Sequence, residues 1–208
     1  MFAMKKLLFS VLPLVLLSLP AAADEKQNDN EAGFISLFNG KDLSGWRISE
    51  KGKFRVEDGK IVVNGPRSHL FTEREFKNFE FRAEVMTTPG SNSGIYFHTE
   101  YLDEGWPVKG HETQVNVTQR DPVKTGSLYG IVKLYETPVK DNQWWTQTII
   151  VRCQNIVIKI NGKTVVDYTE PEGIKGPRRV SRGAFALQAH DPKSVIYYRN
   201  IRVKPFSD

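Results

Sequence analysis

The sequence predicts an all-β protein, a jelly-roll sandwich of two antiparallel sheets. Apolar and polar residues alternate in several runs, as in Phe79–Val85, and this is the period of a half-buried strand. Turn signals rich in Gly, Pro, Asn and Asp recur about every ten to fifteen residues, and beyond residue 23 no stretch of helix length has a helical period. The 23 aromatic residues (12 Phe, 7 Tyr and 4 Trp) also favour strands.

The individual strands follow from the same alternation. Residues 53–57 and 60–63 flank Asp58-Gly59, which is typical of a tight β-turn, so they are expected to form a hairpin. A second hairpin is expected where Asn161-Gly162 separates a long β-rich run, residues 148–160, from residues 164–168. The other predicted strands are residues 79–85, 93–98, 113–117, 183–190 and 195–204.

The N-terminal segment has the features of a secretory signal peptide, residues 1–23. Lys5 and Lys6 precede a short apolar stretch, and three alanines then offer a cleavage site. A flexible polar leader, residues 24–32, and one domain, residues 33–208, are expected to follow. The interpretation is an exported protein, periplasmic or extracellular and of bacterial type, with no membrane anchor after cleavage. The single cysteine, Cys153, would then be unpaired in an oxidising compartment and is expected to be buried in a strand.

The charge pattern argues against a nucleic-acid partner. Loss of residues 1–23 would lower the formal net charge from +5 to +3, and the basic residues are not clustered. The short run Lys175–Arg179 is interpreted as a solvated turn. No phosphate-binding glycine loop and no G-x-S-x-G nucleophile motif is present, and Ser93 falls on the predicted core face.

Three strands each carry polar side chains on one face. In an alternating strand Tyr96 and His98 share a face, as do Glu112 and Gln114 on a second strand. Gln188 and His190 share a face on a third. If these strands are neighbours, their amides, carboxylate and aromatic rings suit the binding of carbohydrate. The alternative is an ordinary solvated sheet face, although such a face would favour Lys, Thr and Glu.

Other residues allow more than one interpretation. Trp106 is either an aromatic at the rim of the site or a structural cover, and Tyr129 is either a pocket residue or a packing anchor. His69, beside an apolar pair, is interpreted as a strand-edge residue. No cofactor is predicted. A divalent metal held by His98, Glu112 and His190 is chemically possible, but no local ligand spacing supports it.

Several segments, taken together and in order, resemble the 3-keto-disaccharide hydrolase domain family. They are LFNGKDLSGW, VEDGKIVV, HLFTEREFKNFEFRAEV, SNSGIYFHTE, GHETQVNV, TGSLYG, INGKTVVDY, GAFALQAH and YYRNIRVKP. The resemblance spans essentially the whole domain and implies a concanavalin A-like jelly roll that acts on sugars oxidised to a ketone at C3. The chain departs from the family pattern at His98, Val117 and Trp145.

The resemblance also implies roles for individual residues. The E-x-Q motif falls on Glu112 and Gln114, which implies an acid/base role for Glu112, and the L-Q-x-H segment gives His190 a part in holding the keto group or the leaving oxygen. The implied substrate-binding residues are Gln114, His98, Tyr96, Tyr129, Gln188 and Trp106.

Two alternatives remain open at this point. An ordinary glycosidase would need a second carboxylate from Asp103, Glu104 or Asp121. The same polar face would also serve a non-catalytic carbohydrate-binding module, because this type of sandwich hosts lectins as well as enzymes. The sequence does not predict the oligomeric state.

Overall fold

A computed structural model describes residues 32–50 and 52–207 of the chain, so the predicted signal peptide and almost all of the predicted leader lie outside the described residues. The described part contains strands and no helix, and therefore no helix that could cross a membrane. The strands are β1 (Ile35–Ser36), β2 (Trp46–Ile48), β3 (Lys53–Glu57), β4 (Lys60–Asn64), β5 (Ser68–Thr72), β6 (Phe79–Thr87), β7 (Asn92–Thr99), β8 (His111–Asn116), β9 (Trp145–Arg152), β10 (Asn155–Ile160), β11 (Lys163–Thr169), β12 (Ala184–Ala189) and β13 (Val195–Pro205).

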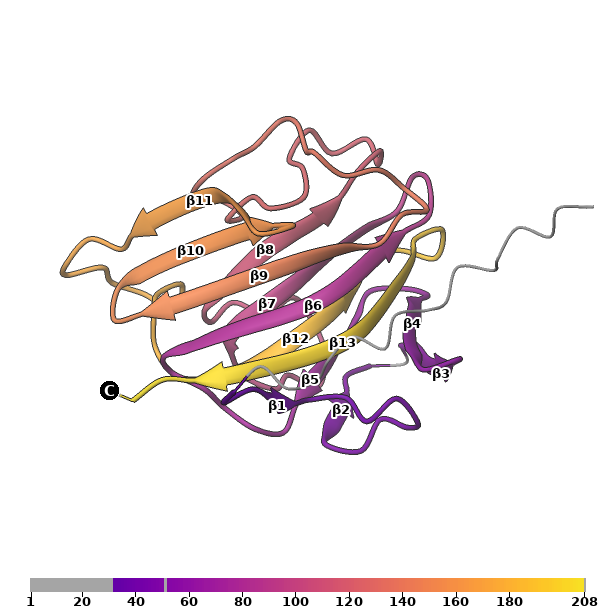
Figure 1. Cartoon of the computed structure of the whole chain (residues 1–208), viewed down its shortest axis with the longest axis horizontal. Coiled ribbons are helices and arrows are strands. Elements are labelled where there is room, and N and C mark those ends of the chain that lie inside the picture. The colour runs from indigo at the N-terminus through magenta and orange to yellow at the C-terminus, as the bar shows by residue number, and fades with distance from the viewer. Residues whose placement is uncertain (1–31, 51, 208) are drawn as a thin grey trace, which may run out of the picture. The chain divides into compact units, whose positions relative to one another are not determined.

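These strands form two antiparallel sheets, and the predicted fold class is confirmed. The larger sheet has the order β11-β10-β9-β6-β13-β4-β3, with β1 added to β13. The smaller sheet has the order β2-β5-β12-β7-β8 and lies behind the larger one in Figure 1. Both predicted hairpins are present, as β3–β4 and β10–β11.

The core lies between the sheets and is built from alternate residues of their strands. Phe79 and Phe81 of β6 contact Phe185 of β12, with ring centroids 4.7 and 4.5 Å apart. Ser93 also points inward, as predicted, and its hydroxyl lies 2.9 Å from that of Tyr198. The alternating pattern therefore buries one face of the smaller sheet and leaves the other face for a site.

The run from residue 148 to residue 160 is two strands rather than one. β9 ends at Arg152 and β10 begins at Asn155, and a turn at Cys153 joins them. Cys153 has a left-handed backbone (φ 51°) and is exposed, so the expectation that it is buried in a strand is wrong. The turn was not predicted because apolar residues lie on both sides of it and because Cys153 occupies the left-handed position, where Gly or Asn is usual.

The smaller sheet brings together the three strands that carry the polar face. β7 lies between β12 and β8, so the expectation that these strands are neighbours is confirmed. His69 is not a strand-edge residue, because β5 lies between β2 and β12 and the His69 side chain is fully buried.

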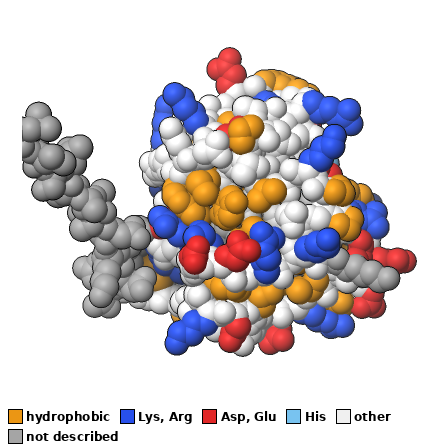
Figure 2. All heavy atoms as spheres, turned by 90° about the vertical axis from the view of Figure 1, so that its right-hand side faces the viewer, with side chains coloured by type: hydrophobic (Ala, Val, Ile, Leu, Met, Phe, Trp, Pro, Cys, Tyr) orange, Lys and Arg blue, Asp and Glu red, His pale blue; other side chains and the backbone are white. Residues whose placement is uncertain are grey.

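Charged side chains of both signs are mixed on the face shown in Figure 2, and patches of hydrophobic side chains lie between them. No broad region of one sign is visible on this face. This mixture agrees with the low net charge of the chain.

Candidate functional site

A cavity of about 240 Å³ lies on the face of the smaller sheet that points away from the core. Strands β7, β8 and β12 form its floor, and the loops between strands supply its walls. Side chains with hydrogen-bonding groups dominate the lining, which consists of Asn92, Tyr96, Trp106, Glu112, Gln114, Asp121, Tyr129, Arg178, Gln188 and His190. Seven of the eight site residues predicted from the sequence therefore share one cavity.

The Glu112 carboxyl group is buried in the floor of this cavity. Glu112 of β8 pairs with Tyr96 of β7, and its carboxylate lies over Gly94, where an added Cβ would collide with Oε1. Burial raises the pKa of Glu112 from 4.5 to about 7, although hydrogen bonds from Tyr96 and Gln188 and the nearby charge of Arg178 act to lower it. A carboxyl group that titrates near neutral pH can both accept and donate a proton.

Gln188 connects the Tyr96 hydroxyl and the Glu112 carboxylate at the centre of the cavity floor. Its Nε2 donates to the Tyr96 hydroxyl (3.0 Å) and to Glu112 Oε1 (3.3 Å). Because the carboxylate can only accept, the amide orientation is fixed and Gln188 Oε1 points elsewhere. That oxygen is buried and has no hydrogen-bond partner in the protein.

Gln114 and Asn92 form a second amide pair beside Glu112. Gln114 Nε2 donates to Asn92 Oδ1 at 3.1 Å, and both side chains are buried. Sequence reasoning missed Asn92, although extending the alternation of β7 one residue before Ser93 would have placed it on the polar face.

An aromatic and an imidazole lie at the rim of the cavity. Trp106 is 42% exposed, and its ring centroid lies 5.7 Å from those of both His190 and His69. Tyr129 is also partly exposed, and both Trp106 and Tyr129 line the cavity. The buried His69 ring makes an edge contact with Trp106, and burial lowers the pKa of His69 to about 4.

His98 does not lie in the cavity. Its backbone is left-handed (φ 56°), and the pairing of β7 with β12 is irregular at this point. The ring therefore contacts Phe79 in the core, and its Nε2 hydrogen-bonds to the carbonyl of Lys77 at 2.8 Å. Strict alternation fails here because a left-handed residue breaks the two-residue period.

Arg178 is a cavity residue that sequence reasoning did not identify. It belongs to the segment Lys175–Arg179, which is exposed as expected of a solvated turn, but Arg178 also lines the cavity. The Pro177 carbonyl accepts from Gly110 N (3.0 Å), and Ser181 N donates to His98 Nδ1 (3.2 Å). No periodic signal predicts such a residue, because it reaches the cavity from a loop.

A buried pair of side chains also anchors this loop. Glu170 accepts from the Val180 amide at 2.9 Å and from His111 Nε2 at 3.2 Å. Burial first, and the charge of Arg178 second, lower the pKa of His111 to about 4. The imidazole is therefore neutral at pH 7, and its contact with Glu170 is a hydrogen bond rather than an ion pair.

The carboxylates considered as partners of Glu112 lie in different places. Asp121 lines the cavity, whereas Asp103 lies 3.9 Å from Arg47 in an exposed ion pair. Within the described residues, no group of three or more His, Cys, Asp or Glu side chains is arranged to hold a metal ion. His98 could not join Glu112 and His190 in such a group, because its ring points into the core.

Comparison with known proteins assigns the domain to a family. The sequence model of the 3-keto-alpha-glucoside-1,2-lyase-like domain matches residues 33–204. The chain belongs to this family. The match includes every residue that lines the cavity, and it confirms the resemblance found in the sequence motifs.

Individual proteins resemble the chain in sequence or in fold. The 3-keto-disaccharide hydrolase of Bacteroides thetaiotaomicron is 35% identical over 94 residues, which is 39% of this chain but only 30% of that protein's length. A proposed glycosyl hydrolase from Parabacteroides distasonis has a TM-score of 0.74 and 22% identity, over 86% of this chain and 96% of that one. The carbohydrate-binding module CBM66 of Bacillus subtilis has a TM-score of 0.57 and 12% identity, over 77% and 95%.

Proposed function

We propose that the protein cleaves glycosides that carry a ketone at C3, by elimination followed by addition of water. The observation that carries this proposal is the buried Glu112 carboxyl group, which titrates near pH 7 in a cavity lined by hydrogen-bonding side chains. The family and the name of the curated relative support the same class of substrate.

The chemistry follows from the position of the ketone. A carbonyl at C3 acidifies the proton on C2, so the Glu112 carboxylate removes that proton and an enolate forms. The C1–O bond then breaks, a double bond forms between C1 and C2, and Glu112 returns the proton to the leaving oxygen. Addition of water across the double bond gives the free 3-keto sugar, and the net reaction is hydrolysis.

The other cavity residues have supporting roles in this scheme. The positive charge of Arg178 acts on the Glu112 carboxylate and lowers its pKa. In this scheme the same charge stabilises the negative charge of the enolate. Gln114 and Gln188 orient sugar hydroxyls, and Trp106 offers an exposed ring for stacking on the apolar face of a sugar.

The first test is cleavage of a 3-keto disaccharide and of its unoxidised parent, with release of free sugar as the readout. We expect cleavage of the keto form alone, and a loss of at least 100-fold in kcat for Glu112→Gln with the fold retained. Glu136→Gln, at an exposed position outside the cavity, is the matched control. Cleavage of the parent sugar would instead indicate a two-carboxylate mechanism in which Asp121 takes part. The same assays with added chelator test whether the reaction requires a metal ion.

The pH dependence provides a second test of the same group. Elimination requires the Glu112 carboxylate, which is populated above its pKa of about 7. We therefore expect kcat/KM to rise with pH through about 7 and to fall about tenfold per unit at lower pH. A rate that is constant between pH 5 and pH 8 would exclude Glu112 as the base.

A non-catalytic carbohydrate-binding module is the second candidate. The exposed Trp106 ring and the fold shared with a bacterial carbohydrate-binding module favour it. Calorimetry with unmodified oligosaccharides separates the two functions, because tight binding without turnover is expected only of the module.

We also propose that the protein is exported, on the basis of the signal-peptide features of residues 1–23. Cell fractionation with N-terminal sequencing tests this, and cleavage after Ala23 is the expected result. An intact N-terminus on cytosolic protein would contradict export.

A further inference from the structure

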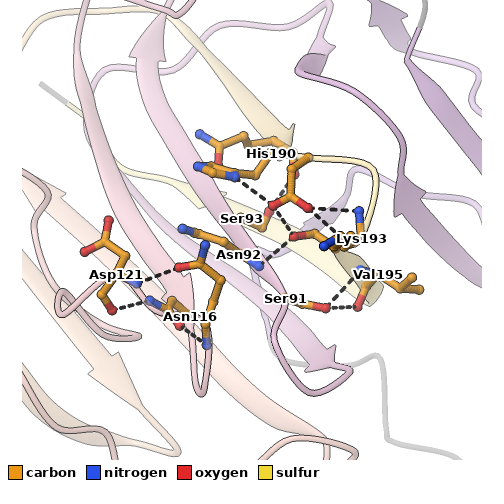
Figure 3. Close-up of polar contacts among 12 residues, drawn as sticks. Ser91, Asn92, Ser93, Asn116, Asp121, His190, Lys193 and Val195 are labelled. Atoms are coloured by element: carbon orange, nitrogen blue, oxygen red, sulfur yellow. Dashed lines mark hydrogen bonds and ion pairs between the residues drawn. The ribbon is translucent and has the colours of Figure 1, made fainter.

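The turn that follows β12 holds His190 through a neighbouring carboxylate. Asp191 Oδ2 accepts from His190 Nδ1 (2.9 Å) and from the Ser194 hydroxyl (2.8 Å), while Oδ1 accepts from the backbone amides of Lys193 (2.9 Å) and Ser194 (3.2 Å). Figure 3 shows this network beside Asn92, whose backbone N–H donates to the Ser194 hydroxyl at 2.9 Å. Burial acts to raise the pKa of Asp191, but the hydrogen bonds from His190, Ser194 and Lys193 outweigh it and lower the pKa.

This network determines which nitrogen of His190 carries the proton. An ionised carboxylate only accepts hydrogen bonds, so the proton of the neutral imidazole lies on Nδ1. Nε2 then keeps its lone pair, and His190 lines the cavity. The turn therefore presents a proton acceptor to the site.

Glu112 and His190 differ in their access to water. Glu112 is 4% exposed and lies on the cavity floor, whereas the His190 side chain is 34% exposed and lies at the rim beside Trp106. A group that activates water has to contact solvent during the reaction, and a group that moves the C2 proton to the leaving oxygen does not.

We propose that Asp191 is a positioning residue that fixes the tautomer of His190, and that His190 serves the addition of water while Glu112 serves the elimination. The assignment rests on the proposed function. In this step, His190 Nε2 takes a proton from water as the water oxygen bonds to C1. The electron pair of the C1–C2 double bond shifts toward the C3 carbonyl, and an enolate forms. The imidazolium, stabilised by Asp191, then returns the proton to C2.

The experiment compares the wild-type protein with Asp191→Asn. The asparagine keeps an oxygen for the two backbone amides of the turn but places a donor against His190 Nδ1, which transfers the imidazole proton to Nε2. Lys193→Ala is the matched control, because only the backbone of Lys193 contacts Asp191. The tautomer is measured by the ¹⁵N chemical shifts of the neutral His190 ring.

The two half-reactions are assayed separately. Elimination is followed as release of the alcohol from a 3-keto glycoside, and hydration is followed with the synthetic 1,2-unsaturated 3-keto sugar. We expect Asp191→Asn to slow hydration at least tenfold, to leave elimination within twofold of wild type and to accumulate the unsaturated ketone, with the proton moved to Nε2.

Several results would overturn the proposal. It fails if the His190 ring of the wild-type protein already carries its proton on Nε2. This measurement does not depend on the folding of any variant. It also fails if both half-reactions slow equally while the tautomer is unchanged, or if the tautomer changes and hydration does not. If the wild-type protein hydrates the unsaturated ketone but does not carry out elimination, the proposed function is contradicted. The role of Asp191 is still tested in that case, because the hydration assay and the ¹⁵N shifts do not depend on elimination.

Discussion

At the scale of single residues, the site depends on Gly94, which has no side chain. The Glu112 carboxylate occupies the space above Gly94 that any other residue would fill with its Cβ. Gly94 has no left-handed backbone, so the requirement for glycine at this position is steric and not conformational.

We therefore expect Gly94→Ala to displace the carboxylate and to lower both stability and activity. The destabilisation should be about 1–3 kcal/mol, as for overpacked buried sites, and kcat should fall at least tenfold. A double-mutant cycle measured by denaturant unfolding checks the cause. The alanine should cost less in a Glu112→Ala background, where the colliding group is gone, and an equal cost in both backgrounds would point to a different clash.

Sequence reasoning succeeded for residues that follow strand alternation and failed where that alternation does not apply. Glu112 and Gln188 were assigned to one face because their strands are regular. The position of His98 was predicted wrongly because one left-handed residue turns its ring into the core. Arg178 was missed because the backbone contacts that place its loop come from residues distant in the sequence.

At the scale of elements, the loop between β11 and β12 brings the cation into the site. Backbone amides of this loop are bound by Glu170 and by His98, two groups that do not touch the cavity. The loop is therefore held in place by partly buried hydrogen bonds, which is expected of a wall that must keep a charge in position.

Replacement of Arg178 tests the function of this loop. We expect Arg178→Gln to lower kcat about 10- to 1000-fold by removing stabilisation of the enolate. It should also shift the acid limb of the pH profile upward, because the Arg178 charge lowers the pKa of Glu112. Arg179→Gln, the neighbouring substitution outside the cavity, should leave both quantities unchanged. Equal effects of the two variants would mean that the general basic charge of the loop matters and that Arg178 has no specific role.

At the scale of the whole molecule, buried titratable groups tie stability to pH. Burial lowers the pKa values of His69, His98 and His111 from 6.5 to about 4, and each takes up a proton on unfolding between these values. Glu112 acts in the opposite direction, because its folded pKa of about 7 exceeds 4.5 and it releases a proton on unfolding.

Between pH 4.5 and 6.5 the unfolded chain therefore binds about two more protons than the folded one, three from the histidines less one from Glu112. We expect the free energy of unfolding to fall by about 3 kcal/mol for each unit of acidification in this range. Denaturant unfolding at several pH values measures this slope, and His69→Phe should reduce it by about half. Stability that is independent of pH in this range would contradict the burial of neutral imidazoles.

The order of strands in the smaller sheet also bears on how the protein folds. Gln188 reaches Tyr96 and Glu112 across 92 and 76 residues of sequence, and β12 pairs with β5 and β7, which precede it by a large part of the chain. Such non-local pairing makes folding slow, because loop closure precedes any stabilising contact. A nascent chain that ends before β12 lacks the residues that complete the cavity. Activity should therefore appear only after the C-terminal strands have docked, late in folding.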